Sequence, residues 1–466
     1  MSDLPKFQTG LQSSMKTRSM GVKLMVVCGL ALLMNIPALF VGSLVGDRNA
    51  RAGDVVKEIS SHVGGQQTFL GPTLAIPYVV PPQSVTQTAK HGIYLVFPTR
   101  ASSVVKTATE ERHRSLFKVP VFQADVKFDA AFDLTGVPAA APKDAELDWS
   151  HAEIVVGVSN VRGALADAML VAGGRTVTLV PSEIADNLSI GGDESQHIKL
   201  ALLGARAEVF AKPNAQFDVT STLRFSGAQR IAVLAYGKTT HLAVQGNWPS
   251  PGFDGGFLPV TRTVSAIGFN AEWSVPFVAR SVRAEGSSES ITGLDATALG
   301  VSFIEVADPY QSVNRSLKYV TLFLGLIFLS YFVFEVTTGK RVHPAQYVLV
   351  GIAQIIFYLL LLSLAERIGF DFGFLFAGAA TVVLLSANAG WVFSSRSQGL
   401  RALAIFTLLY ALIYLLLRLE DNALLVGAIA SFLALAAAMY FTRSIDWYSS
   451  LQSGTNEAPS DTSIPQ

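Results

Sequence analysis

The chain has 466 residues, of which 50% are hydrophobic and only 15% are charged. Soluble proteins carry about 25% charged residues, so a large part of this chain is expected to lie in lipid. Basic and acidic residues balance at 35 each, which excludes the broad electrostatic attraction of nucleic-acid-binding proteins, and we expect no nucleic-acid partner. The single cysteine, Cys28, excludes an intrachain disulfide and a cysteine-ligated zinc site.

The first apolar run, Leu24 to Gly46, follows an N-terminal tail of residues 1–23. It is 23 residues long and uncharged, and Asn35 is its one strongly polar residue. At about 1.5 Å per residue it is long enough to cross a hydrocarbon core of about 30 Å. A cleaved signal peptide is the alternative, because Ala50-Arg51-Ala52 resembles a small-x-small cleavage site. Signal h-regions have only about 7–15 residues, so we favour an uncleaved transmembrane helix at 24–46.

Residues 47–314 contain no spanning run and are expected to form one large β-rich, sandwich-like domain. From Phe122 to Leu134 every even position is apolar and the odd positions are mostly polar. This period of two buries one face of a sheet and leaves the other in water. The same alternation is predicted for two further sets of apolar residues: Phe217, Val219, Leu223 and Phe225, and Ile267, Phe269, Ala271, Trp273, Val275 and Phe277.

Two short helices within the β-rich domain and a polar C-terminal tail are also expected. Short helices are predicted at Asp54–Ser61 and Ala164–Val171 within the β-rich domain. Residues 446–466 are polar and without periodicity, and they are expected to form a disordered cytoplasmic tail.

The last third of the chain, residues 315–445, is predicted to form a bundle of five transmembrane helices. Their expected positions are about 319–334, 346–364, 370–393, 402–417 and 423–441. Together with the run at 24–46 they make six spans. An even number of spans places both termini on the same side of the membrane.

Basic residues indicate which side that is, because cytoplasmic loops carry an excess of Lys and Arg. If the termini are cytoplasmic, the two short outer loops hold only Arg367 and Arg418. The cytoplasmic segments then hold nine basic residues: Lys6, Lys16, Arg18, Lys23, Lys340, Arg341, Arg396, Arg401 and Arg443. The predicted topology therefore has cytoplasmic termini and an exported β-rich domain.

The sequence contains no recognisable catalytic, cofactor-binding or metal-binding set. Its seven histidines are scattered and form no H-x-x-x-H or H-E-x-x-H arrangement. There is also no G-x-S-x-G nucleophile elbow and no G-x-x-x-x-G-K-[ST] phosphate loop. We therefore predict a protein that is not an enzyme and that uses no cofactor or metal.

Polar side chains in the spans are the remaining candidates for function, because polar groups are costly in lipid. They are Asn35, Gln354 and Asn388 within spans, and Glu420 and Asp421 at the start of the last one. We interpret Gln354 as an interhelical hydrogen-bonding residue, and Glu420 and Asp421 as capping the last helix. The alternative is a transport path lined by Asn35, Gln354 and Asn388.

Several motifs, in the same order along nearly the whole chain, resemble one family. In the membrane region they are R-S-L-K-Y-V-T-L-F from Arg315, H-P-A-Q-Y-V-L-V-G from His343 and L-E-D-N-A-L-L-V-G from Leu419. In the β-rich region they are G-P-T-L-A-I-P-Y from Gly71, N-W-P-S-P-G-F from Asn247 and D-P-Y-Q from Asp308. These motifs are similar to those of the CreD family. The chain departs from the family at Val63-Gly64, where an aromatic is expected before the glycine, and at Asn422, where the family often carries Tyr.

The resemblance implies a bacterial inner (plasma) membrane protein linked to cell-envelope integrity and to a two-component stress response. It implies no catalytic residues, ligand or substrate. We predict a non-enzymatic envelope-integrity factor, held in the lipid bilayer, whose periplasmic domain binds an envelope component such as a protein or glycan. The alternative is a transporter or export-accessory protein that uses the six-helix bundle. A water-accessible cavity reaching Asn35, Gln354 and Asn388 would favour transport.

Overall fold

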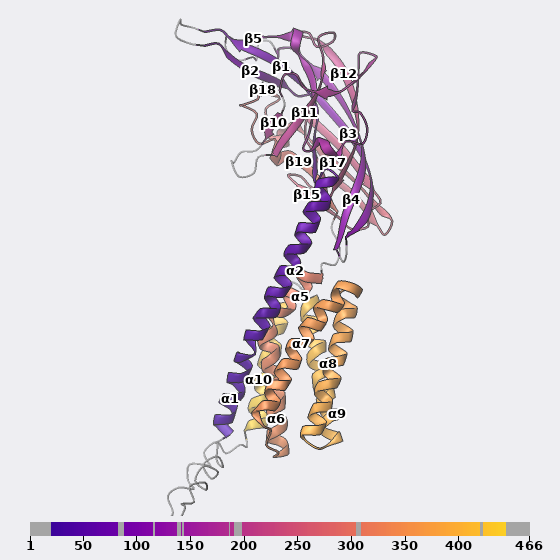
Figure 1. The fold of residues 1–466 in the computed structure, drawn as a ribbon. Helices are drawn as coiled ribbons and strands as arrows, with labels where there is room; N and C mark the ends of the chain where they lie inside the picture. The colour runs from indigo at the N-terminus through magenta and orange to yellow at the C-terminus, as the bar shows by residue number, and fades with distance from the viewer. Residues whose placement is uncertain are drawn as a thin grey trace, which may run out of the picture. The chain divides into compact units, whose positions relative to one another are not determined.

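A computed structural model of the chain (Figure 1) describes residues 20–82, 88–114, 117–137, 141, 144–185, 187–190, 198–303, 309–419 and 423–443. The chain divides into two compact units. The first, the membrane unit, comprises Met1–Arg51 and Ala307–Gln466, and the second, the β unit, comprises Ala52–Val306.

The membrane unit is built from long helices that run side by side in Figure 1. Five helical segments of the described chain are long and apolar enough to cross a membrane, namely Gly21–His62, Val320–Thr338, Pro344–Ile368, Phe370–Val392 and Arg396–Arg418. The last four are α6, α7, α8 and α9. A further helix, α10 (Ala423–Thr442), covers the sixth predicted span. The spans predicted at 319–334 and 402–417 are longer in the structure, at 19 and 23 residues.

Two features of the helices were not predicted from the sequence. A short helix, α5 (Pro309–Lys318), precedes α6, although its first residues were assigned to the β-rich segment. The N-terminal segment consists of α1 (Met20–Leu33) and α2 (Asn35–His62), separated at Met34. Pro37 explains the separation, because it has no N–H to bond the carbonyl four residues earlier.

The second helix also continues well beyond the predicted end of the first span at Gly46. Its last two turns carry Val56 and Ile59, which together with Val63 pack against a small cluster of the β unit. The cluster consists of Val119, Val121 and Ala228. The short helix predicted at 54–61 is therefore the end of α2 rather than a separate element.

The β unit contains two sheets. Within the described residues the first sheet has 11 strands. Seven of them follow the order β10 (Asn187–Ile190), β11 (Ile198–Arg206), β6 (Glu153–Val158), β1 (Gln67–Val80), β13 (Arg230–Leu234), β19 (Ala298–Phe303) and β15 (Pro251–Gly255). The other four pair off this path: β2 (Lys90–Val96), β5 (Glu146–Leu147), β9 (Val180–Pro181) and β18 (Glu285–Ser287).

The second sheet has eight strands within the described chain. Their order is β16 (Thr261–Ser265), β17 (Gly268–Val275), β14 (Thr239–Gly246), β3 (Arg100–Arg114), β4 (Phe117–Asp133), β12 (Gln216–Ala228), β7 (Met169–Ala172) and β8 (Arg175–Thr178). Most neighbours in both sheets are antiparallel, whereas β3 and β14, and β1 and β13, pair in parallel.

The two sheets bury their inner faces against each other. Phe69 of β1 meets Phe225 of β12 with ring centroids 5.5 Å apart. Phe303 of β19 meets Phe122 of β4 at 5.1 Å. These contacts join the two sheets in one hydrophobic core, which is the arrangement of a β-sandwich.

The alternation predicted for Phe122 to Leu134 is confirmed. All seven even positions are buried, with exposed fractions between 0% and 4%. Of the residues between them, Gln123, Asp125 and Lys127 are exposed, and Asp129, Ala131 and Asp133 are half-buried. The pattern therefore identified both the strand and its inner face.

Two sequence predictions in this unit are wrong at specific residues. Ile267 is 87% exposed and Phe277 is 44% exposed, because Ile267 lies in the turn before β17 and Phe277 begins the short helix α4 (Phe277–Arg280) after it. The helix predicted at Ala164–Val171 is not present. Ala164 instead forms an isolated bridge to Phe225, and strand β7 begins at Met169.

Candidate functional site

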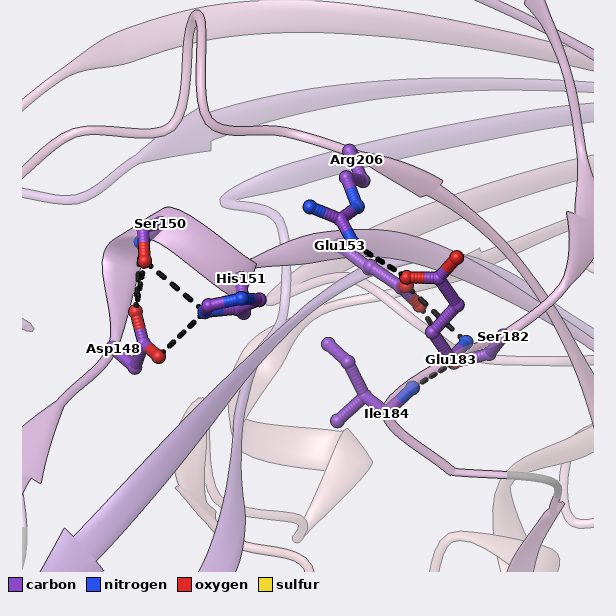
Figure 2. A network of polar contacts seen from close by, with 8 residues as sticks. All are labelled: Asp148, Ser150, His151, Glu153, Ser182, Glu183, Ile184 and Arg206. Carbon is purple, nitrogen blue, oxygen red and sulfur yellow. Dashed lines mark hydrogen bonds and ion pairs between the residues drawn. The ribbon is translucent and has the colours of Figure 1, made fainter.

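A pocket of about 610 Å³ lies on the first sheet of the β unit. Four segments of that sheet and two loops contribute to it. The lining residues are Pro77, Tyr78, Val79, His91, Gly92, Ile93, Asp148, His151, Glu153, Glu183, Ile184 and Arg206. Figure 2 shows the polar groups of this pocket and the contacts between them.

The apolar wall of the pocket comes from the pairing of β1 and β2. Tyr78 lies directly opposite Gly92, and Val79 lies opposite His91. A Cβ atom at position 92 would lie 2.5 Å from the ring of Tyr78. The glycine therefore permits the tyrosine ring to lie flat across the neighbouring strand, where it is buried.

Glu153, at the start of β6, anchors one side of the pocket. Its carboxylate is 4% exposed and accepts a hydrogen bond from Ser182 Oγ at 2.6 Å and from the Glu183 N–H at 3.2 Å. Ser182 Oγ in turn accepts the Ile184 N–H at 3.2 Å. A buried carboxylate needs such partners, so these contacts hold the loop that follows β9 in one conformation (Figure 2).

The same loop presents a charged pair to solvent. Arg206 Nη2 donates to Glu183 Oε2 at 2.6 Å, and both side chains are more than half exposed. The Glu183 carboxylate raises the pKa of Arg206 above its ordinary value. Exposed pairs add little to stability, so both groups remain available to a ligand.

Across the pocket, the 3₁₀ turn Trp149–His151 carries a second polar group. Asp148 caps this turn and accepts the Ser150 N–H at 3.1 Å. Its other oxygen lies 2.7 Å from His151 Nδ1. The hydrogen bond from the Ser150 hydroxyl, followed by that from His151, lowers the pKa of Asp148. The carboxylate is therefore ionised at neutral pH.

Asp148, Ser150 and His151 share the residue types of a catalytic triad but not its geometry. In a triad the serine and the carboxylate bind different nitrogens of the imidazole, so that the ring can transfer a proton between them. Here Ser150 Oγ lies 3.1 Å from Nδ1, the nitrogen that also faces Asp148. The arrangement therefore does not activate the serine.

The pocket does not bring metal ligands together either. Over the part of the chain that the structure describes, no group of three or more His, Cys, Asp or Glu side chains could hold a metal ion. What the pocket offers is a buried tyrosine, two histidines and fixed charges of both signs. Such groups recognise a polar ligand by hydrogen bonds and stacking.

Two comparisons with known proteins bear on the whole chain. Residues 19–448 match the family described as Inner membrane protein CreD. A protein of Escherichia coli (strain K12) named Inner membrane protein CreD is 30% identical over 432 residues, which cover 91% of this chain and 93% of the relative. The chain belongs to the CreD family. The resemblance seen in the motifs is thereby confirmed, and this CreD-family protein is a multi-pass protein of the inner membrane.

The polar residues predicted within the spans of this CreD-family chain lie in three separate places. Gln354 is fully buried on α7 and accepts a hydrogen bond from Tyr410 of α9 at 3.2 Å. Asn388 of α8 accepts one from Tyr331 of α6 at 3.1 Å. Asn35 donates to the backbone of α1 and accepts from Thr321. Glu420 and Asp421 lie outside the described residues.

None of these three side chains lines the groove of about 590 Å³ that lies between α8 and α9 of the membrane unit. Each is engaged in a hydrogen bond with a helix of the bundle. A transport path lined by these residues stays a prediction.

Glu335 was not among the functional residues predicted from the sequence, yet its carboxylate is buried and has several partners. It is 2% exposed and forms an ion pair with Lys23 of α1. It also accepts the Val342 N–H and the Tyr347 hydroxyl, each at 3.0 Å. Glu335 lies near the end of a predicted span, where charged residues usually face the membrane–water interface. In this chain it joins α1, α6 and α7.

Proposed function

We propose that this CreD-family protein is a non-enzymatic envelope-integrity factor whose β unit binds an envelope component, either a protein or a glycan. The pocket on the first sheet is the binding site in this proposal. The single observation that carries it is the preformed polar lining: buried Glu153 fixes the loop that presents Glu183, and Asp148 fixes His151 opposite. The volume of about 610 Å³ lies in the range of ligand sites, roughly 300–1,000 Å³.

Variants of the exposed pocket residues test this proposal. We expect Glu183→Gln and His151→Ala to lower capture of periplasmic proteins or cell-wall glycan fragments several-fold, because each removes a group that faces the pocket. Full-length detergent-purified protein is offered each class of material separately, and the bound material is quantified. Neither change should alter folding, since exposed substitutions usually shift stability by only about 0.5 kcal/mol.

Glu110→Gln is the matched control for this test. Glu110 lies on the second sheet and its side chain is 65% exposed, against 66% for Glu183. Capture by Glu110→Gln should equal that of the parent protein. If the pocket variants capture as much as the parent and this control, the pocket is not the binding site.

The proposed topology has six spans, both termini in the cytoplasm and residues 47–314 in the periplasm. It is supported by the nine-to-two distribution of basic residues over the short loops and by the helix at Ala423–Thr442. The ion pair of Lys23 with Glu335 supports an uncleaved first span at 24–46. In the same proposal residues 1–23 and 446–466 are cytoplasmic tails, and 315–445 hold the other five spans.

Alkaline phosphatase fusions test the topology, because the enzyme is active only outside the cytoplasm. A fusion after Phe303 should be active, and one after Trp447 should be inactive. Activity after Trp447 would require an odd number of spans. N-terminal sequencing of the purified protein tests the first span, and a start at Gly53 would show that it is removed as a signal peptide.

A further inference from the structure

The groove between α8 and α9 is apolar along its length and polar at one end. It is lined by Asp371, Phe372, Phe374, Leu375, Gly378, Ala379, Val382 and Val383 of α8, and by Leu403, Thr407, Tyr410, Ala411 and Tyr414 of α9. The polar end is where α8 begins and α9 ends.

Small residues create the groove. Gly378, Ala379 and Ala411 lie where larger side chains would fill it. A Cβ atom at position 378 would lie 3.2 Å from the ring of Tyr410, so the glycine lets that ring form the floor. Tyr410 is buried, whereas Phe372 and Leu375 at the sides are about 60% exposed.

The length of the groove matches one leaflet of a bilayer. From Asp371 to Val383 the groove follows twelve residue steps of α8, which at about 1.5 Å per residue is roughly 18 Å. Half of a hydrocarbon core of about 30 Å is roughly 15 Å. An acyl chain whose head group lies at the polar end would therefore fit along the groove within one leaflet.

The polar end carries both signs of charge within one cluster. Arg418 pairs with Asp371, Tyr414 donates to Asp371 Oδ1 at 3.1 Å, and Arg418 Nε donates to the Tyr414 hydroxyl at 3.3 Å. The side chains of Arg418 and Asp371 are 56% and 50% exposed. A carboxylate has about four acceptor sites and a guanidinium about five donors, so this pair retains capacity for a ligand.

We propose that this groove is a binding site for a phospholipid with a zwitterionic head group that contains a primary ammonium, as in phosphatidylethanolamine. The acyl chain lies along Gly378 and Ala379, the phosphate accepts hydrogen bonds from Arg418, and the ammonium donates to Asp371. An anionic head group would match Arg418 but face the charge of Asp371 without compensation. A choline head group has no N–H and cannot donate to Asp371.

Lipid retention by the full-length protein tests this proposal. The protein is purified in detergent, washed free of loosely held lipid, and exposed to mixed micelles that contain phosphatidylethanolamine, phosphatidylcholine or phosphatidylglycerol. Bound lipid is then measured by mass spectrometry. We expect selective retention of phosphatidylethanolamine, and a loss of about tenfold, equivalent to about 1.4 kcal/mol, on Ala379→Phe, which fills the groove, and on Asp371→Asn.

Two matched controls separate groove binding from general effects. Ala380→Phe adds the same ring one residue along α8, at an exposed position that does not line the groove. Arg367→Gln removes an exposed charge near the start of α8 that does not line the groove. Its lipid retention is compared with that of Arg418→Gln. Both controls should retain lipid as the parent does.

Several outcomes would overturn the proposal. Equal retention by Ala379→Phe and Ala380→Phe would show that the groove holds no lipid. Retention of phosphatidylglycerol or phosphatidylcholine at the level of phosphatidylethanolamine would refute the head-group assignment. Helical circular dichroism shows whether Ala379→Phe folds. If it does not, the test is the amount of phosphatidylethanolamine retained by Asp371→Asn and Arg418→Gln. Retention equal to that of Arg367→Gln would refute the proposal.

Discussion

Replacing Lys23 with methionine is expected to destabilise the membrane unit by about 3–5 kcal/mol, the cost of leaving a buried charge without its partner. Glu335 is 2% exposed, and Lys23 is its cationic partner in an ion pair. Lys23 also donates to the Val342 carbonyl at 2.7 Å. For a unit of this size the change corresponds to a drop in melting temperature on the order of 10 °C. Helical circular dichroism of the detergent-purified protein measures it.

A double-mutant cycle separates the ion pair from the general loss of a side chain. The pair Lys23→Met with Glu335→Gln should be more stable than Lys23→Met alone, because no unpaired charge remains. The glutamine oxygen can still accept the Val342 N–H, and its NH2 group can donate to the Tyr347 hydroxyl that faced the second carboxylate oxygen. Lys318→Met is the control, since Lys318 is exposed, and it should melt within about 0.5 kcal/mol of the parent. Additive effects of the two single changes would refute the coupling.

Truncating Phe128 to alanine is expected to cost the β unit about 3–5 kcal/mol. Phe128 is fully buried in β4 and packs edge to face on Tyr236, with ring centroids 5.4 Å apart. Removing the ring leaves a cavity between the sheets that the neighbouring strands cannot close. Typical domains have a total stability of roughly 5–15 kcal/mol. Tryptophan fluorescence during guanidinium unfolding reports the loss, because Trp149, Trp248 and Trp273 all lie in this unit.

Asp129→Asn on the opposite face of the same strand is the control. The Asp129 carboxylate accepts from Thr220 Oγ1 at 2.7 Å and pairs with Lys127 at 2.9 Å. An asparagine oxygen can still accept from Thr220, and the ion pair is exposed, so we expect a change of only about 0.5 kcal/mol. The reverse order of the two losses would mean that the inner and outer faces of β4 are exchanged.

The sequence by itself determined those features that depend on neighbours along the chain. Alternation from Phe122 to Leu134 identified an inner face, because successive side chains of a strand point to opposite sides of the sheet. Long apolar runs identified the helices at 344–368 and 370–392 closely, because a span needs about 20 apolar residues. Several motifs in the same order along the chain, among them those from His343 and Gly71, indicated the CreD family.

The alternation of apolar residues gave wrong predictions just beyond the two ends of a strand. Ile267 and Phe277 continue the alternation of β17 in sequence, yet both are exposed. The strand itself covers only Gly268–Val275. Periodicity carries no information about where the hydrogen-bonded ladder stops, so residues beyond it follow the turn or helix in which they lie.

Only the tertiary structure showed the pocket on the first sheet and the contacts of Glu335, because the residues of each are far apart in sequence. The pocket joins Tyr78, His91, His151, Glu183 and Arg206 through the order in which β1, β2, β6 and β11 pair. Glu335 meets a lysine 312 residues away. A carboxylate near a span end has the same sequence pattern whether it reaches water or is buried against a cation. Long-range packing alone distinguishes the two, since it sets whether that charge is desolvated and which group compensates it.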